Sequence, residues 1–189
     1  MSKLVLPKLE KPYVHEKATV MGNVTLGDSC SIWPGAVLRA DLNTITLGKY
    51  VNIQDNSTLH TDYNSQIVIG DYTLVGHNVM IHGAKIGKAC LIGIGSILLD
   101  NCEIGDGAQI TAGCMIRGGK KIPPHSLVFS KNGELQILPN KAKVEATIAG
   151  SIEYVILAQR ALANDFSRIE NFSEIEVLTK ALSAELFPK

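Results

Sequence analysis

The sequence has few aromatic residues, no excess of charge and no long apolar run. Phe, Trp and Tyr make up 5% of the 189 residues, and 18 basic side chains balance 18 acidic ones. A nucleic-acid surface needs a positive field along the phosphates and aromatic rings on which bases stack, so nucleic acid is not an expected partner. No apolar stretch reaches the roughly 18 residues that cross a bilayer, and no membrane partner is expected.

The first eight residues also lack the features of a secretory signal peptide. The segment MSKLVLPK has neither an apolar stretch of the required length nor a small-residue cleavage pattern. A cytoplasmic location is therefore expected. With 46% hydrophobic residues, a chain of 189 residues can bury one core, so we expect one domain with a small appendage.

What the sequence does contain is a short repeat. A branched aliphatic residue recurs at every sixth position over roughly residues 14 to 130, and glycine often follows it. Such a repeat makes one short strand and one turn, and three repeats close a triangular coil whose aliphatic side chains stack inside. The repeat therefore predicts a parallel β-helix, an all-β solenoid, over residues 1–140.

Every third repeat falls on the same face of the predicted prism, which sorts the aliphatic residues into three columns. The first column holds Val20, Leu38, Leu59, Ile81, Leu98 and Ile116. The second column holds Val14, Ile32, Ile53, Val75, Ile92, Ile110 and Val128, and the third takes the remaining repeats. Departures from the six-residue step all lie at one corner, after first-column repeats, where the connections are expected to form the walls of a cleft.

The four cysteines fit this interior. Cys30, Cys90, Cys102 and Cys114 each lie four residues after a repeat aliphatic, at the inward-facing position that small residues occupy elsewhere. We interpret them as reduced thiols of the core, in agreement with a reducing compartment.

Beyond about residue 127 the repeat fades into helical patterns. Residues 141–163 and 171–186 have apolar side chains at the i, i+3, i+4 spacing of amphipathic helices. The C-terminal helical segment, residues 141–189, is expected to pack on the prism or on a neighbouring subunit, because a solenoid otherwise exposes strand edges and apolar surface.

Three histidines indicate a metal site. His60 and His82 each follow a first-column aliphatic by one residue, so they stack on neighbouring coils about 4.8 Å apart. Two imidazoles at that spacing can share one ion, since zinc–nitrogen bonds are about 2.0–2.1 Å long. His77 belongs to the second column and is separated from His82 by about 16 Å of extended chain. His15 and His125 are interpreted as polar turn residues.

His77 cannot easily join the other two histidines within one chain. A neighbouring subunit in a three-fold assembly would supply it, which predicts a homotrimer with equivalent sites at its interfaces. Three histidines and an open fourth position are typical of a catalytic zinc site. Further polar residues fall into the same two columns: Arg39 stacks on His60, Asp41 is nearby, and Gln54 and Asp55 lie beside and beneath His77. We interpret Arg39, Asp41 and Asp55 as ion-pair residues that fix the register between subunits and secondarily orient the site.

These residues lie in segments with a specific resemblance to a known family. Segments 38–41 (LRAD), 52–56 (NIQDN) and 76–83 (GHNVMIHG), with the isolated His60, resemble the γ-class carbonic anhydrases over nearly the whole chain. The resemblance implies left-handed β-helical homotrimers that bind zinc, or sometimes iron or cobalt, through three histidines at the subunit interface. The activity it implies is reversible hydration of carbon dioxide to bicarbonate by a metal-bound hydroxide.

The resemblance also assigns roles to individual residues. The metal ligands would be His60 and His82 of one chain and His77 of its neighbour. Arg39, Asp41 and Asp55 match the intersubunit ion-pair residues of the family, and Gln54 matches the glutamine that contacts the metal-bound solvent. Leu42 stands where the most active members carry a glutamate, and the connection 61–66 has Asp62 as its single acid, so slow or absent turnover is one expectation.

Three other functions stay open at this point. Hexapeptide-repeat proteins include acyltransferases that bind coenzyme A between subunits, usually with a single catalytic histidine, and some close relatives resemble acyl-coenzyme A thioesterases. A scaffold that keeps the metal without efficient turnover is the non-enzymatic alternative. Protection by acetyl-coenzyme A would favour the acyl-group functions, whereas co-purification with a large complex would favour the scaffold.

Overall fold

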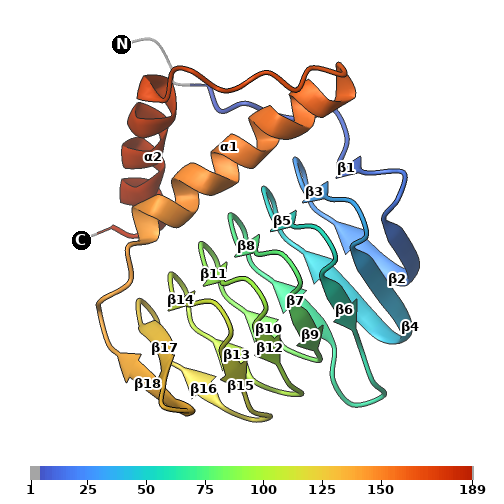
Figure 1. Cartoon of the computed structure of the whole chain (residues 1–189), viewed down its shortest axis with the longest axis vertical. Coiled ribbons are helices and arrows are strands. Elements are labelled where there is room, and N and C mark those ends of the chain that lie inside the picture. The colour runs from blue at the N-terminus through green and yellow to red at the C-terminus, as the bar shows by residue number, and fades with distance from the viewer. Residues whose placement is uncertain (1–4, 189) are drawn as a thin grey trace.

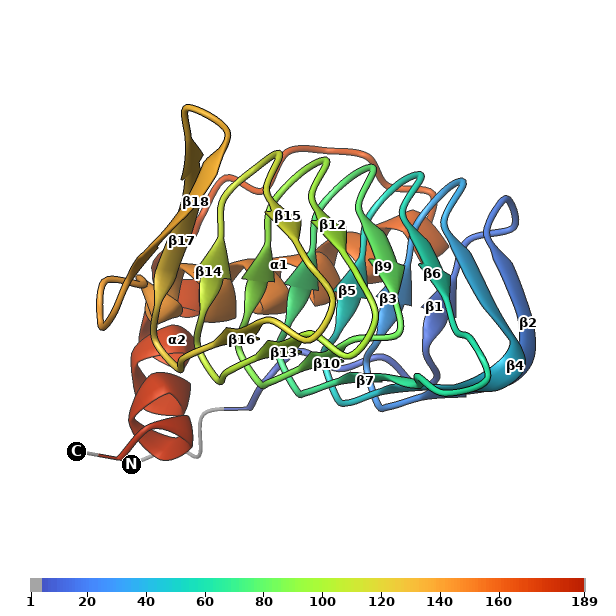
Figure 2. The same ribbon diagram turned by 90° about the horizontal axis from the view of Figure 1, so that it is seen from below.

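The structure, a computed structural model, describes residues 5–188 as a parallel β-solenoid with two C-terminal helices (Figure 1). Seen from below, successive coils stack along one axis, and helix α1 (Val144–Leu162) runs behind the strands (Figure 2). The predicted fold class, a parallel β-helix followed by helices, is confirmed.

The strands form two sheets. The eight-stranded sheet has the order β1 (Tyr13–Val14), β3 (Ser31–Ile32), β5 (Asn52–Ile53), β8 (Leu74–Val75), β11 (Leu91–Ile92), β14 (Gln109–Ile110), β17 (Leu127–Lys131) and β18 (Glu134–Leu138). The other sheet contains two arms that meet at β4 (Val37–Leu47). One arm holds β6 (Thr58–His60), β9 (Met80–His82), β12 (Ile97–Leu98) and β15 (Met115–Ile116), and β2 (Thr19–Leu26) pairs with β4. The other arm holds β7 (Ile67–Ile69), β10 (Lys85–Ile86), β13 (Glu103–Ile104) and β16 (Lys121–Ile122).

The register of these strands confirms the predicted columns. In the first column Leu59 lies between Leu38 and Ile81, and in the second column Ile53 lies between Ile32 and Val75. The side chains on either side of each inward aliphatic residue point away from the interior, because successive side chains of a strand point to opposite faces. The pairing therefore also decides which polar residues share an outer face.

One corner of the prism differs from the expected turn. Strand β4 continues through it for 11 residues, pairing with β6 by its first part and with β7 by its last part. The first and third columns are therefore one bent sheet at this end of the solenoid. The neighbouring strand β2 makes the same bend with a register shift after Gly22, whose φ of +82° places its missing Cβ where the carbonyl of Ala40 lies.

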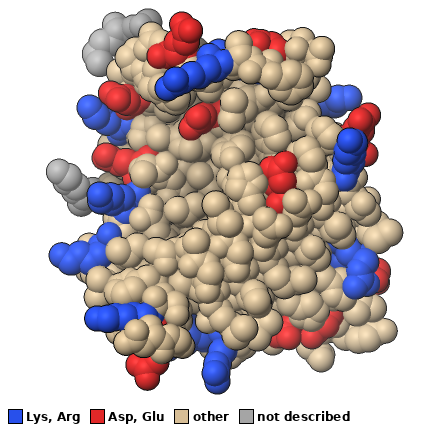
Figure 3. Space-filling view, in the orientation of Figure 1, with Lys and Arg blue, Asp and Glu red and all other residues tan. Residues whose placement is uncertain are grey.

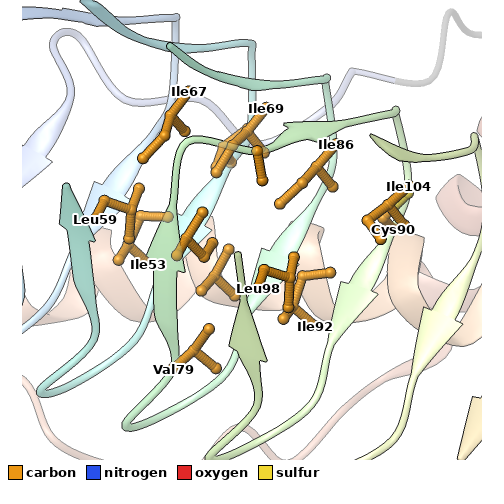
Figure 4. Packing of buried hydrophobic residues seen from close by; sticks show 14 of the residues in the cluster. Ile53, Leu59, Ile67, Ile69, Val79, Ile86, Cys90, Ile92, Leu98 and Ile104 are labelled. Carbon is orange, nitrogen blue, oxygen red and sulfur yellow. The ribbon is translucent and has the colours of Figure 1, made fainter. Parts of the chain in front are cut away.

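The interior is a stack of aliphatic side chains from all faces. Figure 4 shows Ile53, Leu59, Ile69 and Leu98 pointing inward from different strands toward one another. All four side chains are buried, as is the sulfur-bearing Cys90 beside them. This continuous core holds the coils in register and thereby fixes the outer positions at which the polar residues stack.

The four cysteines are buried and free, as the repeat predicts. Burial raises the pKa of Cys30, Cys90 and Cys102 from the ordinary 9.0 to about 12. Such thiols are inert toward disulfide exchange while the fold is intact, because the thiolate is the reactive form.

Because these thiols are buried, we expect the folded state to lose stability at high pH. A raised folded-state pKa contributes stability that is fully present below 9.0 and is lost as the pH rises toward about 12, because the unfolded chain releases its protons first. We expect the urea midpoint to fall across that interval, and replacing Cys30, Cys90 and Cys102 together by alanine to flatten the fall. An equally steep decline in the triple variant would contradict the assignment.

The C-terminal end of the solenoid is closed by a hairpin that the repeat does not predict. Strands β17 and β18 pair antiparallel, with Val128 opposite Ile137. The side chain of Ile137, with that of Leu135, packs against the core. The hairpin thus occupies a sheet edge that would otherwise be free to pair with another chain.

Two helices follow the hairpin. Helix α1 (Val144–Leu162) contacts β3 and β8 of the eight-stranded sheet, and α2 (Ser173–Leu186) packs against α1. The buried side of α1 includes Ile148, Ile152 and Val155, at the predicted helical spacing. The helix begins three residues later than expected, where the amide of Gln109 hydrogen-bonds both the N–H and the carbonyl of Lys143. Neither helix is apolar over a length that could cross a membrane.

Candidate metal centre

His60 and His82 form the centre of the site. Each ends its strand one residue after an inward aliphatic, so β-sheet alternation turns both rings outward on the same face. The two residues are direct cross-strand partners, and their ring centroids lie 5.1 Å apart. The stacking predicted from the columns is confirmed.

One nitrogen of each ring faces a nitrogen of the other ring. His60 Nδ1 lies 3.1 Å from His82 Nε2. Two ligand nitrogens of a tetrahedral zinc ion are about 3.3 Å apart, given zinc–nitrogen bonds of about 2.0–2.1 Å. The spacing of the facing nitrogens therefore fits two ligands of one ion with little adjustment.

The other nitrogen of each ring meets a carboxylate. His60 Nε2 lies 3.1 Å from Asp41 Oδ1, and His82 Nδ1 lies 2.6 Å from Asp100 Oδ1. Because a carboxylate accepts hydrogen bonds, a neutral ring that donates its one proton to its carboxylate keeps its lone pair on the facing nitrogen. Two facing lone pairs repel unless a cation lies between them. A carboxylate behind each histidine is the usual arrangement around a metal ion.

Arg39 and Asp41 extend this arrangement along the first column. Arg39 pairs with His60 across the strands, and its guanidinium forms an ion pair with Asp41. Desolvation acts to raise the pKa of Asp41, but hydrogen bonds from Arg39 and His60 outweigh it and keep that pKa below its ordinary value. Asp41 therefore stays ionised and orients His60.

His77 lies apart from the other two histidines within the chain. It follows β8 in the eight-stranded sheet, in the turn before Asn78, whose left-handed φ of +55° sharpens the corner. Its Nδ1 lies 3.1 Å from Asp55 Oδ2, which leaves Nε2 free to bind, and 40% of its side chain is exposed. Gln54, beside Asp55, is 7% exposed. The structure therefore brings His60 together with His82, and His77 together with Asp55, as two separate groups.

Asp100 is a site residue that the sequence reasoning missed. Asp62, His82 and Asp100 are the one set of His, Cys, Asp or Glu residues in 5–188 whose ligand atoms all lie within 4.8 Å. As an ion site this set is the weaker candidate, because Asp62 Oδ1 already accepts hydrogen bonds from the Ser65 hydroxyl and from the N–H groups of Asn64 and Ser65. Asp100 lies two residues after Leu98, so extending the column comparison by one position would have found it.

The remaining two histidines have structural contacts. His15 Nδ1 accepts the N–H of Lys17, and the ring of His125 packs edge-on against Phe187. Both lie in turns, as the sequence interpretation holds. Neither belongs to the groups described above.

Several curated relatives of this chain are named carbonic anhydrases. The chain is 44% identical over 95 residues to a carbonic anhydrase of Geobacillus kaustophilus, covering 50% of this chain and 52% of that protein. It is 35% identical over 120 residues to γ carbonic anhydrase 1 of Arabidopsis thaliana mitochondria, covering 60% and 44%. The matches thus span about half the length of these two relatives. A probable carbonic anhydrase of Methanocaldococcus jannaschii is 34% identical over 142 residues, which cover 75% of this chain and 89% of that protein.

The chain belongs to the γ-class carbonic anhydrase family. A family model that describes bacterial transferase hexapeptide repeats also matches residues 83–118 of this chain. A crystal structure from Bacillus cereus shares its fold with a TM-score of 0.73 at 34% identity, covering 82% of this chain and 95% of that one. AntD, an N-acyltransferase from Bacillus cereus, matches at 15% identity with a TM-score of 0.63, which shows a common fold alone.

Apart from the carboxylates that contact the histidine rings, few acidic side chains lie in the segments next to the paired histidines. Leu42 follows Asp41, and in the connection after β6 Asp62 is the single acid. Hydrogen bonds from the Ser65 side chain and the Asn64 N–H hold the pKa of Asp62 below its ordinary value, which makes it a weak proton acceptor at neutral pH.

Proposed function

We propose that this protein is a metal-dependent, carbonic anhydrase-like enzyme that hydrates carbon dioxide reversibly at the interfaces of a homotrimer. The observation that carries the proposal is the pair His60 and His82, whose ring nitrogens face each other at 3.1 Å while carboxylates bind their outer nitrogens. This donor set fits zinc, and imidazole donors also accept iron or cobalt.

The position of His77 supports the trimer. Two histidines leave a tetrahedral ion under-coordinated, and His77, in the turn after β8 of the other sheet, contacts Asp55 through Nδ1 and keeps Nε2 for a ligand. A three-fold axis lets each chain present its His60–His82 face to the His77 corner of the next. All three interfaces then become equivalent, and each holds a complete three-histidine site.

The surface beside the paired histidines suits a subunit interface. Met80, Ile97 and Met115 stack on the outer face of β9, β12 and β15, and Met80 lies two residues before His82. Met80 and Met115 are 38% and 52% exposed. On the molecular face that Figure 3 shows in the orientation of Figure 1, most charged side chains also lie toward the edges. Interface cores are similarly poor in charge and rich in methionine.

In this assembly each residue has a definite task. His60, His82 and the neighbour's His77 would hold the ion, which supplies the Lewis acidity that brings the pKa of a bound water near 7. Asp41 and Asp55 hold the rings of His60 and His77 by their other nitrogens. Gln54 would orient the reacting water through its side-chain amide. Asp62 is a weak proton acceptor, which leaves the proton to bulk solvent or buffer, so turnover should be slow and should rise with buffer concentration.

Loss of Arg39 should weaken the trimer. The guanidinium is paired with Asp41 within the chain, and the neighbour's Asp55 would be its second partner across the interface. Truncating one member of a charge pair that is buried and hydrogen-bonded in an interface costs about 2–5 kcal/mol. Arg39→Ala should therefore shift sedimentation at low concentration toward smaller species. Lys121→Ala, which removes an ion pair with Glu103 on the third-column face, is the matched control. An unaltered profile for Arg39→Ala would remove its proposed role.

Carbon dioxide hydration measured by stopped flow tests the function. The protein is reconstituted separately with zinc and with iron, and the metal content is determined on the same samples. Activity that scales with bound metal supports a carbonic anhydrase. Full occupancy with no activity at any buffer concentration would reject that enzyme and leave a metal-carrying scaffold.

An acyl-group function makes a different prediction. The acyltransferase AntD, which shares this fold, has been solved in complex with an acyl-coenzyme A. Acetyl-coenzyme A should raise the melting temperature of an acyltransferase or thioesterase, and it should leave a carbonic anhydrase unchanged. Melting temperatures measured with and without acetyl-coenzyme A therefore distinguish an acyl-group enzyme from a carbonic anhydrase.

A further inference from the structure

Asp100 makes the shortest of the three histidine–carboxylate contacts. It follows β12, on the coil next to that of His82, and its Oδ1 lies 2.6 Å from His82 Nδ1. The side chain of Asp100 is 42% exposed and that of His82 is 30% exposed. The contact therefore needs some support from its surroundings if it is to control the ring.

The backbone around Asp100 provides that support. The N–H of Asn101 donates to the carbonyl of Gly83 over 2.6 Å, and the N–H of Gly119 donates to the carbonyl of Asp100 over 2.9 Å. These bonds tie Asp100 to the coil that contains His82 and to the coil beyond. The backbone that carries the Asp100 side chain is thus held on both sides.

Gly83 leaves the space for this contact. It follows His82 directly, at the shortened repeat, and has a φ of +64°. A Cβ at this position would lie 2.1 Å from Ser65 Oγ and 2.8 Å from Asp100 Oδ1. Ser65 Oγ itself lies 3.1 Å from Asp100 Oδ1 and 2.8 Å from Asp62 Oδ1, so its one proton binds either carboxylate. The glycine therefore opens a slot in which Ser65 and Asp100 meet beside the histidine.

We propose that Asp100 is a positioning residue that holds His82 as the Nδ1–H tautomer, with Nε2 aimed at the metal, and that Gly83 and Ser65 form the slot for it. Asp100 acts through His82 and does not itself bind the ion. The inference deepens the proposed function and rests on it for the metal, whereas the tautomer is a property of the chain alone.

The tautomer can be read from long-range proton–nitrogen NMR correlations of the full-length chain before zinc is added, at a pH where the ring is neutral. The wild-type ring of His82 should carry its proton on Nδ1. In Asp100→Asn the amide can donate to Nδ1, so the Nε2–H tautomer should gain population. Asp106→Asn is the matched control, since Asp106 holds the same position after a third-column aliphatic and its Oδ1 accepts the N–H of Lys88. An Nδ1–H tautomer that persists both in Asp100→Asn and in Asp100→Leu, which leaves no acceptor at this position, would overturn the inference.

Zinc affinity of the same variants, measured by competition with a chromophoric chelator, gives the second readout. Asp100→Asn should bind zinc about 10- to 100-fold more weakly, as is usual for loss of a partner behind a ligand. Gly83→Ala should also weaken binding, because its methyl group enters the slot, and Asp106→Asn should bind as the wild type does. Equal affinity in Asp100→Asn and wild type would overturn the inference. A wild-type chain that binds no zinc would instead reject the proposed function, and the tautomer measurement would still decide the role of Asp100.

Discussion

His77→Ala is expected to lower the zinc content from near one ion per chain to near zero, although His60 and His82 remain. Two imidazoles hold zinc far less tightly than three. We therefore expect the zinc affinity to fall by more than the roughly 100-fold that follows loss of a hydrogen-bond partner behind a ligand. Metal content after gel filtration in chelator-free buffer measures the effect. His125→Ala is the control, since that ring packs against Phe187 at a distance from the site. Unchanged zinc content in His77→Ala would refute the three-histidine centre.

A mixing experiment tests whether His77 acts across the subunit boundary. His77→Ala keeps the paired histidines, and a His60→Ala/His82→Ala double variant keeps His77. Neither should hold zinc alone. In randomly mixed trimers about a quarter of the interfaces combine the intact parts of both chains, so co-refolding should restore about a quarter of the zinc and of any activity. Mixed trimers without recovered zinc would place the third ligand elsewhere.

The repeat predicts the interior and the stacking of the outer residues well, for a physical reason. Each coil must bury its aliphatic residues against the next, so a six-residue period fixes the register of neighbouring coils and with it the outer neighbours. His60 and His82 therefore come together as predicted, and Arg39 stacks on His60. Their metal role stays a prediction, since stacking alone does not select an ion.

Features that depend on departures from the period are not predicted. The continuation of β4 around a corner and the hairpin of β17 and β18 arise where the repeat is interrupted, and a periodic pattern carries no information there. The surroundings of Asp100 depend on such a departure, although the column comparison, extended by one position, would have found the residue itself. Its partner Ser65 lies in an irregular connection, and the slot exists only because Gly83 adopts a left-handed φ after a shortened repeat. Such contacts depend on the exact path of the turn.

Leu59→Ala is expected to lower the free energy of unfolding by about 2–5 kcal/mol, because it opens a cavity in the stacked column. Leu59 is fully buried between Leu38 and Ile81, one residue before His60. Val20→Ala is the matched control at the open end of the same column, where the side chain is 38% exposed, and a loss of about 1 kcal/mol is expected. Urea unfolding at a fixed chain concentration measures both. Equal losses would contradict a continuous, tightly packed column.

Zinc should offset the Leu59→Ala loss if the ion joins neighbouring coils. His60 ends β6 and His82 ends β9, so an ion bound to both connects the coil that contains Leu59 to the coil that contains Ile81. Zinc at about 1,000 times its dissociation constant adds about 4.1 kcal/mol to a folded state that alone binds it, enough to restore most of the expected loss. In a Leu59→Ala/His77→Ala variant the same zinc concentration should restore little. Equal rescue in both variants would mean that the ion binds without His77, and the site would then be complete within one chain.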